Sequence, residues 1–193
     1  MRTIVFATNN PHKLQEVQAM IGDKFKLKSL NDIGCTDDIP ETGVTFEVNA
    51  SQKSRYIYTK FNVDCFSDDS GLEVDALMGE PGVYSAHYSG SRDTETNLNL
   101  VLEKLGTNIN RKARFRCVIS LLLNGKEYFF EGSVEGEITP SRSGQAGFGY
   151  DPIFQPDGYP LTFAEMAADV KNGISHRGRA IAKLADFLEK EPG

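Results

Sequence analysis

The sequence predicts a mixed α/β protein. The run 3–7 is short, apolar and β-branched, the form expected of a central strand buried on both faces, and a helix signal follows it. The alternating runs 113–123 and 127–134 are joined by Asn124-Gly125, a strong hairpin signal. A chain of 193 residues with 39% hydrophobic content can bury one core, as one domain or one domain with two lobes.

Composition narrows the class of protein. The net charge of −6 and the pI near 5.1 argue against a general nucleic-acid binder. Because there is neither a long apolar run nor a leader with a cleavage site, we expect no membrane span, no signal peptide and a cytoplasmic protein. The cysteines lack metal-ligand spacing: Cys65 and Cys117 are expected to be buried, and Cys35 to be exposed.

The segment 8–13 connects the first strand to a helix. Asn10 suits the N-cap, Pro11 suits the first helical position, and Gly22 would close the helix. The free backbone N–H groups of such a helix start attract anions, and Lys13 adds a full positive charge. This segment is a candidate phosphate cradle; an ordinary capped helix with a surface lysine is the alternative, and it is favoured for the turn taken alone.

The segment 34–44 is predicted to be a loop, and its Glu41 is a candidate carboxylate ligand for a cation. A helix is predicted from Thr45 to Phe61, with Asn49 and Lys53 on one face near its start. An Asn/Lys pair is ordinarily solvated surface. A helix packed beside the next strand would instead aim Lys53 at the acidic residues that follow.

Two adjacent carboxylates, Asp68 and Asp69, organise the chain. We predict that a strand ends over 63–66, that Ser70-Gly71 reverses the chain, and that 72–77 forms the next strand. Two carboxylates on one turn suit Mg²⁺, or leave one carboxylate as a base. A solvated acidic turn is the alternative, and it is favoured for this motif taken alone.

The middle of the chain is predicted to contain an ordered loop over 78–90, anchored by Val83 and Tyr84, and a helix over 94–105. The segment 144–154 then combines glycines with aromatic residues. Such a segment lets backbone approach a flat ligand while a ring stacks on it.

Phe148, Tyr150 and Asp151 are therefore candidates to hold a nucleobase. A glycine-rich hairpin with packed aromatics is an equal alternative, because the glycine spacing fits neither a Rossmann nor a Walker fingerprint.

The C-terminal part is predicted to form a short helix over 162–168, a turn over 171–173 and a last helix capped by Ser175. This places His176 and Arg177 in the first turn of that helix. Cations there oppose the helix dipole, which indicates that they contact something else.

Six motifs in this order closely resemble the non-canonical purine nucleoside triphosphate pyrophosphatases, the inosine/xanthosine triphosphate pyrophosphatases. They are Thr8-x-Asn10-x-x-Lys13, Glu41-Thr-Gly-x-Thr-Phe-x-x-Asn49-Ala-x-x-Lys53, Asp68-Asp-Ser-Gly-Leu-x-Val-Asp75, Pro81-Gly-Val-Tyr-Ser-Ala86, Gly147-Phe-Gly-Tyr-Asp-Pro-Ile-Phe154 and Ser175-His-Arg177. Each motif alone is weakly specific, but six in order are highly specific.

The resemblance implies an α/β fold with an elongated mixed sheet, flanking helices and two lobes around a central cleft, with residues 1–193 as a single domain. It implies Mg²⁺-dependent hydrolysis of ITP, dITP and XTP to the monophosphate and pyrophosphate, which cleanses the nucleotide pool. It also implies a cytoplasmic homodimer that needs no nucleic acid and no membrane.

The resemblance further implies residue roles. Asp69 would activate water and, with Glu41, hold the metal; Asp68 is a neighbouring acid whose ligand role is left open. The triphosphate would be bound by Thr8, Asn9, Asn10, Pro11, His12, Lys13, Lys53 and Ser70. The base would be surrounded by Phe148, Gly149, Tyr150, Asp151, Lys171, His176 and Arg177, with Phe148 stacking on the purine.

Selectivity follows from hydrogen bonding. His176 and Arg177 as donors to O6 would leave the amino group of adenine unpaired, which discriminates by up to about 10⁴ at well-built sites. Exclusion of GTP needs a further contact. The chain departs from the family pattern at Asn9 and His12, where many members have glycine, and at His87, where arginine is common.

Two other functions remain open at this point. A related pyrophosphatase acting on other modified or pyrimidine triphosphates would use the same metal and lysines. A nucleotide-binding or sensing module would bind without turnover, although every carboxylate and lysine that the resemblance requires is present.

Overall fold

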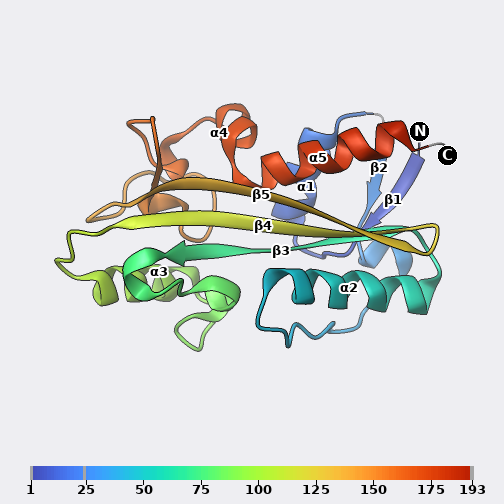
Figure 1. Cartoon of the computed structure of the whole chain (residues 1–193), viewed down its shortest axis with the longest axis horizontal. Coiled ribbons are helices and arrows are strands. Elements are labelled where there is room, and N and C mark those ends of the chain that lie inside the picture. Colours follow the sequence, from blue (N-terminus) through green and yellow to red (C-terminus); the bar gives the residue numbers. More distant parts are fainter. Residues whose placement is uncertain (1, 24, 192–193) are drawn as a thin grey trace. The chain divides into compact units, whose positions relative to one another are not determined.

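The computed structural model of the chain describes residues 2–23 and 25–191, and its fold is mixed α/β (Figure 1). One sheet has the strand order β2-β1-β3-β4-β5-β6. The strands are β1 Arg2–Phe6, β2 Phe25–Lys28, β3 Cys65–Val74, β4 Lys112–Leu123, β5 Lys126–Ile138 and β6 Phe154–Pro156. The helices are α1 Pro11–Ile21, α2 Phe46–Phe61, α3 Thr94–Leu105, α4 Ala168–Ile174 and α5 His176–Lys190.

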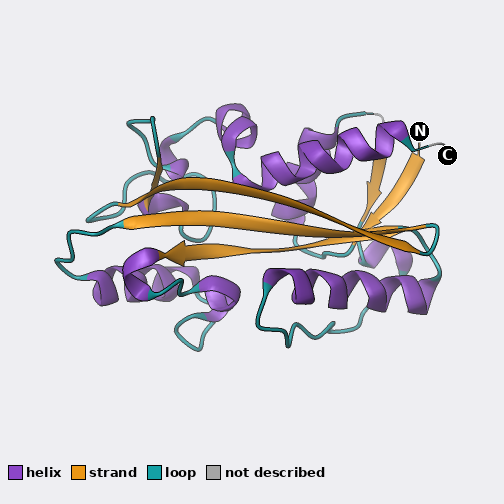
Figure 2. Ribbon diagram, viewed as in Figure 1, coloured by secondary structure: helices purple, strands orange, loops and turns teal. Residues whose placement is uncertain are grey.

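The sheet is mixed because β1 runs parallel to β2 and β3, whereas β5 and β6 are antiparallel. The predicted mixed sheet with flanking helices is therefore confirmed (Figure 2). The described residues divide into two compact units. The cleft between lobes stays a prediction, as does the single-domain organisation.

The first unit comprises the described residues of Met1–Asp69, Cys117–Gly132 and Arg177–Gly193. Its sheet is buried on both faces. On one face, α1 and α5 pack on a core that contains the stacked rings of Phe6 and Phe66, 4.6 Å apart. On the other face, Ile57 of α2 packs with Val5 and Leu122. Since Val5 and Phe6 point to opposite faces, β1 is the doubly buried central strand that its apolar composition predicts.

The second unit comprises Ser70–Arg116 and Ser133–His176. The apolar stripe of α3 packs in its core with Leu72 and Val74 of β3. An aromatic cluster completes this core, with the ring centroids of Phe115 and Phe154 4.6 Å apart and those of Phe154 and Phe163 5.2 Å apart.

Several local signals predicted these elements correctly. Asn10 caps α1 by accepting hydrogen bonds from the backbone of His12 and Lys13, and Thr45 caps α2. The β4–β5 hairpin turns at Asn124 and Gly125, whose φ angles of 50° and 78° are the left-handed values that this two-residue turn requires.

The predicted reversal at Ser70-Gly71 is wrong. Strand β3 runs unbroken from Cys65 to Val74, and Asp75–Leu77 is a short 3-10 turn, not the end of a further strand. Contacts outside the local sequence supply the physical reason. Strand β3 is hydrogen-bonded to β4 in the sheet, and after Gly71 the Leu72 amide donates to the Ser85 hydroxyl and the Val74 amide to the Glu80 carbonyl. Asp68 and Asp69 therefore lie in the middle of a strand and not on a turn.

Two other local predictions also fail. The predicted helix over 162–168 is a 3-10 turn, Phe163–Glu165, followed at Ala168 by the start of α4, and Lys171 to Gly173 lie inside α4. The Lys171 amide donates to the Ala167 carbonyl at 3.0 Å and the Ser175 amide to the Lys171 carbonyl at 2.8 Å, so helical hydrogen bonds hold this segment.

The predictions for two side chains are corrected by their observed burial. Cys35 is buried with Leu30 and Ile57, not exposed. Tyr84 does not anchor its loop, because it is 53% exposed. Ser85 is the buried anchor: its hydroxyl accepts from the Leu72 amide at 3.0 Å and donates to the Gly82 carbonyl at 2.7 Å.

Within the described residues, none of the helices is long and apolar enough to cross a membrane.

The pairing of β5 with β6 predicts an intolerant glycine. A Cβ on Gly136 would lie 2.4 Å from the Gln155 carbonyl oxygen, so Gly136→Ala forces the strands apart. We expect it to lower the free energy of unfolding by about 1–3 kcal/mol in a urea titration. Gly173→Ala is the matched control: its Cβ meets nothing within 4 Å in α4, and a gain of about 0.4–1 kcal/mol is expected. Equal unfolding midpoints for the two variants would contradict this account.

Candidate active site

The first group of candidate site residues surrounds the middle of β3. Alternation along the strand places Phe66 and Asp68 toward α1 and α5, and Ser67 and Asp69 toward α2, where the Ser67 hydroxyl donates to the Ala50 carbonyl. Both carboxylates are nearly inaccessible, at 2% exposed for Asp68 and 7% for Asp69. Buried carboxylates require compensation by charge or hydrogen bonds.

Cations from different helices compensate Asp68. The Lys13 ammonium of α1 lies 3.3 Å from Oδ1, and the Arg177 Nε of α5 lies 3.4 Å from Oδ2. The Lys53 ammonium of α2 donates to the Asp68 backbone carbonyl. Burial alone would raise the pKa of Asp68, but Lys13, Arg177 and Lys53 outweigh it and hold that pKa well below its usual range. Asp68 is therefore ionised at neutral pH.

Asp69 has the opposite electrostatic balance. Burial raises the pKa of Asp69 to about 6; Lys53 opposes the rise, and the nearby negative charge of Glu41 adds to it. A carboxyl group with a pKa close to neutral is suited to take a proton from water at physiological pH. The two adjacent aspartates thus have different chemistry, as expected of groups whose side chains face opposite sides of the sheet.

Lys53 connects Asp68 with Glu41. Its ammonium lies 3.0 Å from Oε1 of Glu41, which is 42% exposed on its side chain. Burial lowers the pKa of Lys53, but the carboxylates of Asp68, Glu41 and Asp69 raise it above its usual value on balance. The lysine therefore stays charged although it is buried.

A magnesium ion fits the carboxylates of Glu41 and Asp69 only if ligands from outside the protein complete its coordination. Among the residues that the structure describes, no group of three or more His, Cys, Asp or Glu side chains forms a closed metal site. Glu41 and Asp69 are nevertheless close enough that one raises the pKa of the other. Mg²⁺ is commonly held by one or two carboxylates together with substrate phosphates and water, and these two residues fit that arrangement.

The polar groups of the predicted phosphate cradle, residues 8–13, hydrogen-bond to one another. Asn10 Oδ1 accepts the backbone N–H groups of His12 at 3.0 Å and Lys13 at 3.2 Å, and the Thr8 hydroxyl accepts that of Asn10 at 3.1 Å. Asn9 Oδ1 accepts the Asn31 amide at 2.9 Å, while Pro11 and His12 are exposed. An anion at this helix start would share donors that Asn10 already uses.

Arg177 has carboxylate partners on α1 and β3. Besides Asp68, its NH1 group lies 2.9 Å from Oε2 of Glu16 on α1. These ion pairs belong to the first unit, and the guanidinium is 3% exposed. The predicted contact of Arg177 with the base edge is not tested by these distances.

The second group of candidate site residues lies in the second unit. The Asp151 carboxylate is buried and accepts from the Lys171 ammonium at 2.7 Å and from the Phe148 amide at 3.0 Å. The same ammonium lies 5.0 Å from the centroid of the Phe148 ring, which is 38% exposed. A buried carboxylate thus holds both a cation and the backbone of an exposed aromatic ring.

Gly147 makes this arrangement possible. Its φ is 74°, and a Cβ would lie 2.2 Å from Asp151 Oδ2, so only glycine lets the chain approach the carboxylate. Gly149 also has a left-handed φ, of 63°.

The remaining predicted residues of this unit have structural contacts. The Tyr150 ring is buried, and its hydroxyl donates to the Ser85 carbonyl at 2.6 Å. His176 is buried and stacks on Phe115 with centroids 4.7 Å apart, and Ser70 is half-buried in β3. Their assigned contacts with a ligand stay predictions.

Sequence reasoning assigned no role to Asn49 or Glu16. Asn49 is buried on α2 and accepts the Gly43 amide at 2.7 Å. A signal for Asn49 was present, since it lies one helical turn before Lys53. Glu16 had only its position one turn after Lys13, which is too common a spacing to indicate a role.

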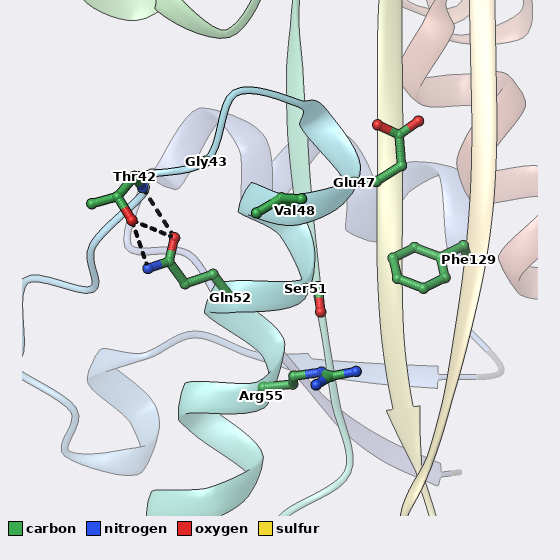
Figure 3. Close-up of a pocket in the computed structure, with 8 residues that line it drawn as sticks. All are labelled: Thr42, Gly43, Glu47, Val48, Ser51, Gln52, Arg55 and Phe129. Atoms are coloured by element: carbon green, nitrogen blue, oxygen red, sulfur yellow. Dashed lines mark hydrogen bonds between the residues drawn. The ribbon is translucent and has the colours of Figure 1, made fainter.

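A surface pocket beside α2 is not this site. A surface pocket of about 520 Å³ is lined by Thr42, Gly43, Glu47, Val48, Ser51, Gln52, Arg55 and Phe129 (Figure 3). None of the residues predicted to bind the substrate or the metal is among them.

Comparisons with known proteins identify relatives. The model of the Ham1 family matches residues 4–187. The dITP/XTP pyrophosphatase of Flavobacterium johnsoniae is 50% identical over 186 residues, 96% of this chain and 97% of that protein. The dITP/XTP pyrophosphatase of Bacillus subtilis is 43% identical over 194 residues, 98% of each.

Solved structures agree with these matches. The structure of the Staphylococcus aureus Ham1 protein is 41% identical with a TM-score of 0.91, covering 99% of this chain and 100% of that chain. The Ham1 protein from Coxiella burnetii is 37% identical with a TM-score of 0.91 and the same coverage. The resemblance predicted from the six motifs is confirmed.

Arg177 is expected to be a stability determinant. Arg177→Met leaves the buried Asp68 and the Glu16 carboxylate without the guanidinium that both contact. Removing one partner of a buried ion pair lowers the free energy of unfolding by roughly 3–5 kcal/mol, which urea denaturation at pH 7 measures. Arg179→Met replaces an exposed arginine two residues further along α5. It should lower the free energy of unfolding by less than about 1 kcal/mol. Equal losses would show that the ion pairs do not stabilise the fold.

Proposed function

The chain belongs to the Ham1 family, and from this premise we propose that it hydrolyses dITP, XTP and ITP to the nucleoside monophosphate and pyrophosphate. Relatives that share 43–50% of its residues over nearly the full chain are dITP/XTP pyrophosphatases. The observation that carries the proposal is the pair of adjacent aspartates. One is held ionised among cations, and the other has a pKa of about 6.

We propose that Asp69 orients a water molecule and accepts its proton. The water oxygen attacks phosphorus, the phosphoanhydride bond between the α- and β-phosphates breaks, and pyrophosphate leaves. Lys13 and Lys53 offset the charge that develops on the phosphate oxygens. We place Arg177 on the phosphate side as well, because its guanidinium already contacts Asp68 at 3.4 Å.

Glu41 and Asp69 are proposed to hold Mg²⁺ together with the substrate phosphates. When bound, this ion would supply Lewis-acid polarisation of a phosphoryl oxygen and would neutralise phosphate charge. Its presence would also relieve the repulsion by which Glu41 raises the pKa of Asp69.

The base is proposed to stack on Phe148. Lys171 carries only donors, so an ammonium held 2.7 Å from Asp151 suits the O6 acceptor of hypoxanthine and xanthine better than the amino group of adenine. His176 remains a proposed second contact to the base. The preference for inosine- and xanthosine-type bases would then arise from donors that adenine leaves unpaired.

We also propose a cytoplasmic homodimer that acts on free nucleotides. The net charge of −6 supports action on small substrates and not on nucleic acid. Sedimentation velocity measures the assembly, and a monomer at micromolar concentration would exclude the dimer.

The central test is hydrolysis of ITP, dITP, XTP, ATP and GTP with Mg²⁺, with pyrophosphate and orthophosphate resolved. Pyrophosphate should form from the first three substrates, and Asp69→Asn should lower kcat by at least about 100-fold because the general base is lost. Asp75→Asn is the control, since Asp75 is a half-exposed acid that faces Arg114. Orthophosphate as product, or equal rates on all five nucleotides, would contradict the proposal.

The role of Phe148 predicts a defect in binding. Phe148→Ala should raise KM for ITP by about tenfold with kcat little changed, because stacking on a base is worth about 1–3 kcal/mol and is made equally in the ground and transition states. Phe129→Ala, which removes a half-exposed phenylalanine of the first unit, should leave KM unchanged. An unaltered KM in Phe148→Ala would remove this residue from the base site.

A further inference from the structure

We propose that Asn49 is a positioning residue that sets Glu41 and Asp69 relative to each other. The proposal rests on the function proposed above for those two carboxylates. Asn49 is 2% exposed on the buried face of α2, one turn before Lys53. Its own amide has no part in the chemistry.

The loop that carries Glu41 depends on side chains for its position. Residues 35–43 form no helix or strand. Asn49 Oδ1 accepts the amide of Gly43, two residues after Glu41, at 2.7 Å. A Cβ on Gly43 would lie 2.4 Å from the Val48 side chain, so the loop lies directly against α2 at this point. The acceptor oxygen of Asn49 is thus the buried attachment of the loop.

A second attachment lies on the exposed side of the same helix. The Gln52 side chain accepts the Thr42 amide at 3.0 Å and donates to the Thr42 hydroxyl at 3.1 Å (Figure 3). Gln52 holds the loop next to Glu41 but contacts no carboxylate of β3 among its described hydrogen bonds. It therefore serves as a matched comparison for Asn49.

The other end of the Asn49 amide faces β3. Its side chain hydrogen-bonds to the Asp69 carboxyl, and this bond lowers the pKa of Asp69 against the effect of burial. Toward a carboxylate only the NH₂ group of asparagine can donate, while its oxygen accepts from Gly43. One planar amide therefore joins the loop of Glu41 to the side chain of Asp69.

This link acts against repulsion. Glu41 and Asp69 are like charges, and their repulsion raises the pKa of Asp69. The Lys53 ammonium, 3.0 Å from Glu41, and the Gln52 side chain also hold the loop, but Asn49 bonds to both the loop and Asp69. Residues that orient metal-binding carboxylates typically change metal affinity or activity by 10–100-fold when replaced. Asn49 meets that description with respect to both carboxylates.

Steady-state kinetics test the link. Asn49→Ala should lower kcat/KM for ITP by about 10–100-fold. Gln52→Ala should lower it less than threefold. In Asn49→Ala/Glu41→Gln the combined loss should be clearly smaller than the product of the two single losses, because part of the effect of Asn49 acts through Glu41. Multiplied losses, or equal effects of Asn49→Ala and Gln52→Ala, would overturn the proposal.

Amide hydrogen exchange, measured by NMR without substrate or metal, gives a readout independent of turnover. Exchange at Gly43 should accelerate about tenfold or more in Asn49→Ala and stay slow in Asn49→Asp, which keeps the acceptor oxygen but cannot donate to Asp69. Asn49→Asp should nevertheless lose activity as strongly as Asn49→Ala. Unchanged exchange at Gly43 in Asn49→Ala, or full activity in Asn49→Asp, would overturn the proposal.

The two measurements separate the failure of this inference from the failure of the proposed function. If the wild-type protein hydrolyses no triphosphate, the function fails, while exchange at Gly43 still decides whether Asn49 holds the loop. If the wild type is active and Asn49→Asp retains its activity, the function stands and the positioning role is wrong.

Discussion

The structure of the first unit depends on one buried carboxylate. Asp68 lies in the middle of β3 at 2% exposure, and an ionised group there is tolerated only when cations surround it. Lys13 of α1 and Arg177 of α5 reach its oxygens, and Lys53 of α2 reaches its carbonyl. Helices far apart in sequence are thereby tied to one strand, and cations from α1, α2 and α5 are gathered around one carboxylate.

Strand geometry then separates the roles of the adjacent aspartates. Because alternate side chains of β3 face opposite sides of the sheet, Asp68 meets the cations of α1 and α5, and Asp69 faces α2 and the Glu41 loop. The pKa of Asp68 falls and that of Asp69 rises to about 6. A reversal at Ser70-Gly71 would have exposed both groups to water and removed this difference.

Local signals predicted much of the fold. The predictions that failed relied on turn composition where backbone hydrogen bonds hold a strand or a helix. Caps, apolar stripes and the Asn124-Gly125 hairpin act over a few residues, so α1, α2, α3 and the β4–β5 pair were predictable. Ser70-Gly71 has the local chemistry of a turn, but the pairing of β3 with its neighbour β4 in the sheet overrides it. The turn predicted at Lys171 to Gly173 is also wrong, because helical hydrogen bonds outweigh the local turn composition there.

The candidate site was predictable as a set of residues and not as a set of contacts. Lys13, Lys53, Asp68 and Asp69 do meet, but nothing in the spacing of Arg177 indicated that it would bond to Asp68 and Glu16. Neighbouring residues at a helix start point in different directions: His176 stacks on Phe115, while Arg177 has carboxylate partners. The Arg177 guanidinium bonds to two carboxylates of the first unit and is 3% exposed, so burial makes it a poor donor for a base edge. Base selectivity is therefore better sought at Lys171, whose ammonium is held by Asp151 beside the exposed ring of Phe148.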